Sequence, residues 1–140
     1  EFEERLRKHT SPYGYPYGAF EVTLINKDCG SRTTYERVDF LTVDRQGIWR
    51  AYEIKVSKSD FYSPAAKSFG GNYNYYVMPE WLYCEVKMDI PKHIGVLVED
   101  VQGTLKSIKQ AKKTDLCLPT QELYISLICS LSRNNERRFK

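Results

Sequence analysis

The stretch that decides the fold runs from Val38 to Lys58 and reads VDFLTVDRQGIWRAYEIKVSK. Two segments with alternating apolar residues flank the polar sequence DRQG, which predicts two antiparallel strands, YERVDFLTVD and IWRAYEIKVS, joined by a hairpin. Because side chains alternate along a strand, Glu53 and Lys55 lie on one face of the second strand. The other face is apolar and carries Tyr52, Ile54 and Val56.

The hairpin also sets which residues of the two strands face each other. A three-residue loop that ends in Gly47 is the common type I turn followed by a left-handed glycine. Asp44 then pairs with Ile48, and counting back along both strands brings Asp39 opposite Glu53. Their β-carbons are expected to lie about 5 Å apart, so two carboxylates face each other.

Two like charges in direct opposition destabilise a strand pair unless another group compensates them. A divalent cation compensates best, and Mg²⁺ prefers one or two carboxylates together with water and phosphate oxygens. Lys55 on the same face would hold a phosphate oxygen or help to orient the attacking water. These residues therefore indicate hydrolysis of a phosphodiester bond.

Asp39 followed by Glu53-Ile54-Lys55 after a hairpin resembles the PD-(D/E)XK phosphodiesterase superfamily, which includes type II restriction enzymes and Holliday-junction resolvases. The string YEIKVSKSDF, followed by a strand rich in tyrosine, is similar more narrowly to the MmcB-like bacterial and phage DNA-repair nucleases. The resemblance covers about Ala19 to Asp100. Val38 takes the place of the proline that gives the superfamily its name.

The resemblance implies an α/β fold with a restriction-endonuclease-like core, in which helices flank a central mixed sheet. It implies a metal-dependent DNA endonuclease that acts in DNA repair, recombination or phage DNA processing. Asp39, Glu53 and Lys55 would be catalytic, with Asp39 and Glu53 binding Mg²⁺, for which Mn²⁺ could substitute. The superfamily often uses one more carboxylate, for which Glu21 is favoured and Glu3 and Glu4 are alternatives.

DNA is the expected partner, and two lysines after the predicted site could contact its phosphates. Lys58 and Lys67 fall on the next predicted helix, where the alternative role is a solvated helix face. The tyrosines at 73, 75 and 76 could stack on bases, but packing within the sheet is the more common use of strand tyrosines. A homodimer is conceivable because many relatives pair to cut both strands. A nucleic-acid-binding or assembly module that keeps the fold without cutting is the alternative function.

The remaining elements follow from periodicity and turn residues. Residues 1–9 predict a short helix with Phe2 and Leu6 on one side, and residues 57–71 a broken helix begun by a capping box of Ser57 and Asp60. Further strands are expected at AFEVTLI, NYNYYVMP, PKHIGVLVED and TLKSIKQ. A helix from Pro119 would carry an apolar stripe of Leu123, Tyr124, Leu127, Ile128 and Leu131, followed by a solvated basic tail, RNNERRFK.

The composition fits a single domain over residues 1–140, with a core at about 19–110 and a C-terminal helix and tail at 119–140. A net charge of +3 is too mild to indicate nucleic-acid binding by itself. The four widely spaced cysteines predict buried free thiols rather than a zinc site. No apolar run is long enough for a membrane helix, so a cytoplasmic protein, bacterial or phage-encoded and without membrane contact, is expected.

Overall fold

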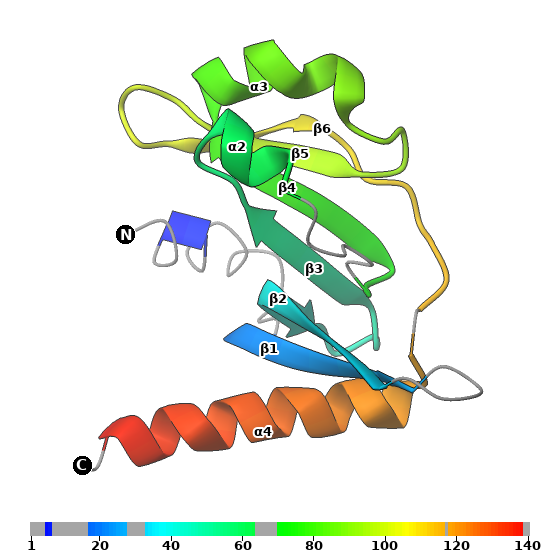
Figure 1. The fold of residues 1–140 in the computed structure, drawn as a ribbon. Coiled ribbons are helices and arrows are strands. Elements are labelled where there is room, and N and C mark those ends of the chain that lie inside the picture. The colour runs from blue at the N-terminus through cyan, green and yellow to red at the C-terminus, as the bar shows by residue number, and fades with distance from the viewer. Residues whose placement is uncertain (1–4, 7–16, 28–32, 64–69, 117, 139–140) are drawn as a thin grey trace.

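The computed structural model describes residues 5–6, 17–27, 33–63, 70–116 and 118–138, without the side chains of 25–27, 33–35 and 134–138. These residues form an α/β fold built on one sheet with the strand order β1-β2-β3-β4-β5-β6 (Figure 1). The sheet is mixed: the first three strands are antiparallel, β3, β4 and β5 are parallel, and β6 is antiparallel to β5. The predicted α/β class and mixed sheet are confirmed.

The strands are β1 at Tyr17–Lys27, β2 at Thr33–Val43, β3 at Trp49–Ile54, β4 at Tyr73–Pro79, β5 at Gly95–Glu99 and β6 at Leu105–Lys109. The described helices are α2 at Lys58–Phe61, α3 at Glu80–Val86, the 3₁₀ turn η2 at Lys87–Asp89, and α4 at Thr120–Arg138. α3 lies above β4 and β5, and α4 lies below the β1–β2 hairpin (Figure 1). None of the described helices combines the length and the apolar character needed to cross a lipid bilayer.

The hairpin between β2 and β3 has the predicted three-residue loop. The Asp44 amide donates to the Ile48 carbonyl at 3.1 Å, and the Gly47 amide donates to the Asp44 carbonyl at 3.0 Å. Gly47 has a φ of +80°, the left-handed conformation that favours glycine. The ladder then runs from Val43 opposite Trp49 to Phe40 opposite Tyr52, which is the register expected from the sequence.

The sheet buries side chains on both faces. One cluster includes Trp49 and Ala51 of β3, Leu82 of α3, and Leu123 and Leu127 of α4. The second cluster consists of Leu6, Phe40, Tyr52, Val77, Leu97 and Leu105. Alternate residues of β3 therefore enter different clusters, so this central strand is held by apolar contacts on both sides.

Helix α4 differs from its prediction in two respects. Its buried line is Leu123, Leu127 and Ser130, and the Ser130 hydroxyl donates to the Phe20 carbonyl of β1 at 2.9 Å. Ile128 remains 59% exposed, and Tyr124 and Leu131 are also exposed, because only one narrow line of the helix meets the sheet. The helix also continues to Arg138, so most of the segment predicted as a solvated tail is helical.

Three further expectations are corrected or fall outside the described residues. The sequence did not predict helix α3, which follows β4 directly. Cys84 and Cys129 are free, as expected, but they are exposed rather than buried, and Cys29 and Cys117 lie outside the described residues. Of the first predicted helix, only residues 5–6 are described, and residues 64–69 of the second predicted helix are also outside the description.

Candidate functional site

Asp39 of β2 and Glu53 of β3 lie side by side in the middle of the sheet. They occupy the next position along the ladder after Phe40 opposite Tyr52. The Asp39 Oδ2 atom accepts a hydrogen bond of 2.7 Å from the Ile54 amide, which fixes the carboxylate against β3. The two carboxyl groups also share a hydrogen bond. The predicted convergence of these side chains on one side of the sheet is confirmed.

The environment of this carboxylate pair keeps a proton on it. Burial, followed by the charge of Asp39 and the hydrogen bond with Asp39, raises the pKa of Glu53 to about 8, while Lys55 opposes the increase. Without a compensating cation, Glu53 is therefore mostly protonated at neutral pH. The pair then carries close to one negative charge, because two adjacent carboxylates resist full ionisation.

Lys55 lies just after β3, and its side chain is almost fully buried, with 6% exposed. Its amide donates to the Val77 carbonyl of β4 at 2.9 Å, which continues the sheet beyond the last assigned residue of β3. The Nζ atom donates to the Asp60 carbonyl oxygen at 3.3 Å and lies 3.6 Å from Asp60 Oδ1. The ammonium group is thus held by the first turn of α2.

That turn is built by a local hydrogen-bond network. The Asp60 amide donates to the Ser57 hydroxyl at 3.1 Å, as the predicted capping box requires. The Val56 amide donates to Asp60 Oδ2 at 3.3 Å, so the same side chain closes the loop from β3 into α2. Asp60 therefore both caps the helix and anchors Lys55. The sequence predicted the cap but not the contact with Lys55, because that contact depends on how the chain turns after β3.

Tyr76 of β4 forms the other flank of Glu53. The parallel register places Tyr76 beside Glu53, and its ring centroid lies 5.2 Å from that of Phe61 in α2. Burial and then the Glu53 carboxylate raise the pKa of Tyr76. The sequence considered Tyr76 for base stacking, whereas the structure packs it into the core beside the carboxylate pair. Its pairing with Glu53 could have been found only from the parallel order of β3 and β4.

Glu21, the favoured third carboxylate, points to a different partner. Its backbone has a φ of +55°, and its side chain forms an ion pair with Arg37 at 2.8 Å. The described part of the chain contains no group of three Asp, Glu, His or Cys side chains suited to a metal ion. In this structure Glu21 therefore does not join Asp39 and Glu53, while Glu3 and Glu4 lie outside the described residues.

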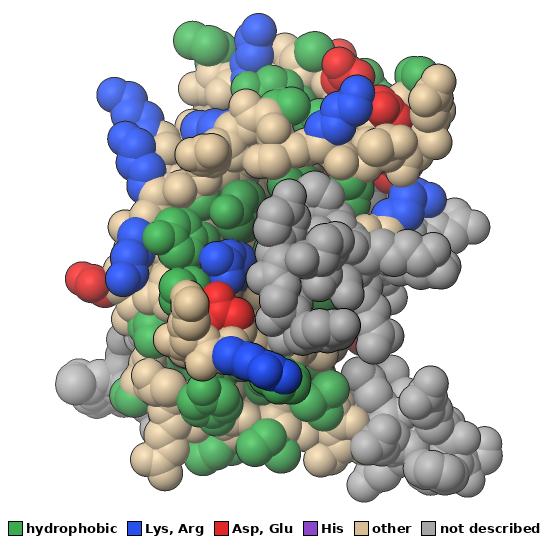
Figure 2. Space-filling model, turned by 180° about the vertical axis from the view of Figure 1, so that it is seen from behind, with side chains coloured by type: hydrophobic (Ala, Val, Ile, Leu, Met, Phe, Trp, Pro, Cys, Tyr) green, Lys and Arg blue, Asp and Glu red, His purple; other side chains and the backbone are tan. Residues whose placement is uncertain are grey.

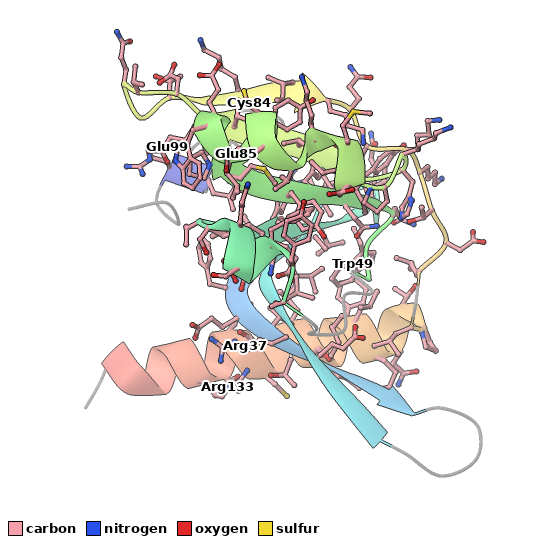
Figure 3. The ribbon with its side chains drawn as sticks, turned by 45° about the horizontal axis from the view of Figure 1, so that its top comes forward. Arg37, Trp49, Cys84, Glu85, Glu99 and Arg133 are labelled. Carbon is pink, nitrogen blue, oxygen red and sulfur yellow. The ribbon has the colours of Figure 1, made fainter. Side chains whose placement is uncertain are left out.

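The lysines expected to contact phosphate are only partly described. The Lys58 side chain is 57% exposed, and its Nζ atom lies 3.8 Å from Glu85 Oε2 on α3. Glu85 lies on the side of α3 that faces α2 (Figure 3). Lys67 falls within residues 64–69, outside the description. Lys58 is thus accessible to a ligand, but an exposed ion pair with Glu85 competes for it.

The other tyrosines of the predicted cluster pack within the sheet. Tyr75 stacks on Tyr52 with ring centroids 5.2 Å apart. Arg50 lies 5.5 Å from the centre of the Tyr73 ring. These contacts lie on the opposite face of β3 from Glu53 and Lys55, so these two rings do not line the carboxylate pair.

No family model matches the sequence, and no curated protein matches it significantly. A solved structure, the SPO1766 protein of unknown function from Silicibacter pomeroyi, is similar over 99% of this chain and 86% of that chain. The TM-score is 0.65 and the sequence identity is 17%. The two proteins share a fold. At this identity the similarity carries no information on activity, so the chemistry has to be inferred from the side chains.

Proposed function

We propose that the protein is a metal-dependent DNA endonuclease with a restriction-endonuclease-like core. The observation that carries the proposal is the carboxylate pair of Asp39 and Glu53 beside a buried lysine, Lys55. Two acidic side chains that repel each other, with an ammonium group close by, are suited to a cation and a phosphate. The proposal thus follows from the chemistry of three side chains on neighbouring strand positions.

The donor set fits Mg²⁺, or Mn²⁺ in its place. Both side chains offer hard oxygen ligands, and the high pKa of Glu53 shows that the pair lacks a compensating positive charge. With two protein carboxylates, the remaining positions of an octahedral ion are left for water and phosphate oxygens. When bound, the ion would supply a more acidic water and stabilisation of charge on the phosphate.

The protein side chains around this position have distinct roles in the proposal. Asp39 and Glu53 would hold the cation, with the Ile54 amide keeping Asp39 in place. Lys55 would donate to a phosphate oxygen or to the attacking water. Asp60 acts through Lys55 by fixing its Nζ atom, and is therefore a positioning residue.

The test combines a cleavage assay with calorimetric Mn²⁺ titration on purified variants. Asp39→Asn and Glu53→Gln should each abolish cleavage of labelled linear, single-stranded and branched DNA, because each removes a cation ligand. Lys55→Ala should also abolish cleavage while Mn²⁺ binding largely persists, because the ammonium group acts on phosphate and water rather than on the ion.

Arg45→Gln is the matched control, because Arg45 is exposed at the tip of the hairpin and far along β2 and β3 from the pair. It should cut like the parent. Cleavage by all three site variants at the parent rate would show that the site is wrong. Nucleic-acid binding by a parent that never cuts would favour the non-cleaving module instead.

A further inference from the structure

The edge of the sheet at β6 concentrates positive charge. Five lysines occur within residues 91–93 and 104–113, and these two segments contain no acidic residue. The lysine edge, as this surface is called below, consists of Lys92, Lys106, Lys109, Lys112 and Lys113. Since the whole chain has a net charge of +3, this edge holds more than the entire positive excess, and the rest of the chain is net negative.

The fold brings these lysines together from two separate segments. Lys109 Nζ donates to the Pro91 carbonyl at 2.8 Å, and the Lys112 amide donates to the His93 carbonyl at 3.0 Å. The turn before β5 therefore lies against the end of β6 and places Lys92 in the same region. Blue Lys and Arg side chains follow the border of the molecule where the chain leaves β6 for α4 (Figure 2).

Carboxylates compensate little of this charge. Lys106 Nζ lies 3.4 Å from Asp100 Oδ2. Among the described residues, no ion pair joins the other four lysines to a carboxylate. Burial and then the charge of Lys112 lower the pKa of Lys109, so at least two of these ammonium groups lie close enough to repel each other. An anionic partner with several charges would relieve that repulsion.

The lysine edge is aligned with the carboxylate pair across the sheet. Glu53 pairs with Tyr76, Tyr76 with Val96, and Val96 with Lys109. Three strand spacings separate the backbones of Glu53 and Lys109, which is about 14 Å. About eight phosphates occur over that length of duplex axis, so one nucleic-acid segment could reach both places.

We propose that the lysine edge binds the phosphate backbone of the nucleic acid on which the carboxylate pair acts. The inference rests on the proposed function, because the site chemistry is what identifies the polyanion as nucleic acid. Lysine provides a mobile point charge that contacts phosphates without reading bases. The contact is therefore expected to be insensitive to sequence and to raise affinity for any segment that reaches the site.

Lysines on an edge strand also serve to prevent pairing with the edge of another sheet, so the test has to separate the two roles. Charge reversal does so, because glutamate also blocks edge-to-edge pairing but repels phosphate. The variant is the double substitution Lys112→Glu with Lys113→Glu, two residues whose side chains form no hydrogen bond or ion pair with the described chain. The control, Arg45→Glu with Arg133→Glu, has the same formal charge change on exposed residues elsewhere.

Binding is measured by fluorescence anisotropy with labelled single-stranded and duplex DNA in EDTA, which prevents cleavage. The lysine-edge variant should bind at least about tenfold more weakly at low salt, and its salt dependence should fall by about one unit of log-log slope for each lost contact. The control should stay near the parent in both quantities. Both proteins should remain monodisperse, which excludes edge-to-edge association as the cause.

Equal loss in the two double variants, or no loss in the lysine-edge variant, would overturn the inference. So would a parent that binds anionic phospholipid vesicles and not DNA, because the partner would then be a membrane surface. Asp39→Asn distinguishes the two proposals: it should bind DNA like the parent and fail to cut. Normal binding through the lysine edge by a parent without cleavage would leave the interface intact and refute only the catalytic proposal.

Discussion

Glu53 illustrates how strongly one position depends on its surroundings. The side chain would be ionised at neutral pH on an exposed strand, whereas here burial and Asp39 hold its pKa at about 8. The sequence predicted the opposition of the two carboxylates because it follows from counting residues back from a short hairpin. The size of the pKa change could not be predicted, because it depends on the burial that Tyr76 and Phe61 create around the pair.

The raised pKa of Glu53 predicts an unusual pH dependence of stability. Between about pH 4.5 and about 8, the folded protein binds the Glu53 proton and the unfolded chain does not, so metal-free stability falls as pH rises through that range. Each unit by which the pKa is raised corresponds to about 1.4 kcal/mol. In EDTA, Glu53→Gln should therefore match the parent near pH 5 and exceed its free energy of unfolding near pH 9.

Urea denaturation of both proteins at several pH values measures this difference directly. Other titrating groups contribute to both curves and cancel in the comparison, apart from Asp39, Lys55 and Tyr76, which face the substituted side chain. Parallel curves for the two proteins from pH 5 to pH 9 would show that the carboxylate pair is not strained in the absence of metal.

At the scale of elements, local signals succeeded and packing decided the rest. The β2–β3 hairpin was predictable because Asp44 and Gly47 specify a short loop within a few residues. Helix α3 was missed, since its seven residues include Trp81, Tyr83 and Val86, which are more typical of strands. Pro79 before the helix, Glu80 in its first turn, and Leu82 and Val86 four residues apart were the available signals.

The apolar stripe predicted for α4 was too broad for a similar reason. Sequence periodicity identifies apolar side chains on one side of a helix but not how much of that side a partner covers. Only the line through Leu123 and Leu127 contacts the sheet, while Ile128 next to it is exposed. The boundary between buried and exposed residues depends on the position of β1, which no pattern within α4 encodes.

This difference between neighbouring residues of α4 can be tested directly. Leu127→Ala should lower the free energy of unfolding by about 2–5 kcal/mol, because a buried leucine is removed from the core. Ile128→Ala should change it by less than about 0.5 kcal/mol, because the isoleucine is exposed. Urea denaturation of the two variants provides the measurement. Comparable losses in both would indicate that another surface covers Ile128 in solution.

At the scale of the whole molecule, charge distribution is more informative than net charge. A value of +3 gave no indication of a nucleic-acid partner, yet the fold gathers five lysines at one edge and two carboxylates in the interior. The gathering was hidden in the sequence because it requires the turn before β5 to meet the end of β6. Topology thus converts a nearly even composition into separate regions of opposite sign.

The two tryptophans of the chain give the molecule two optical reporters of different kinds. Trp49 is fully buried and packs edge-on against Tyr124 of α4, whereas Trp81 on α3 is 54% exposed. Figure 3 shows Trp49 at the start of β3, facing α4. Iodide should therefore quench only the Trp81 part of the emission in the native protein. In a Trp81→Phe variant, the remaining fluorescence should be blue-shifted and should move to longer wavelength when α4 detaches, before or together with global unfolding.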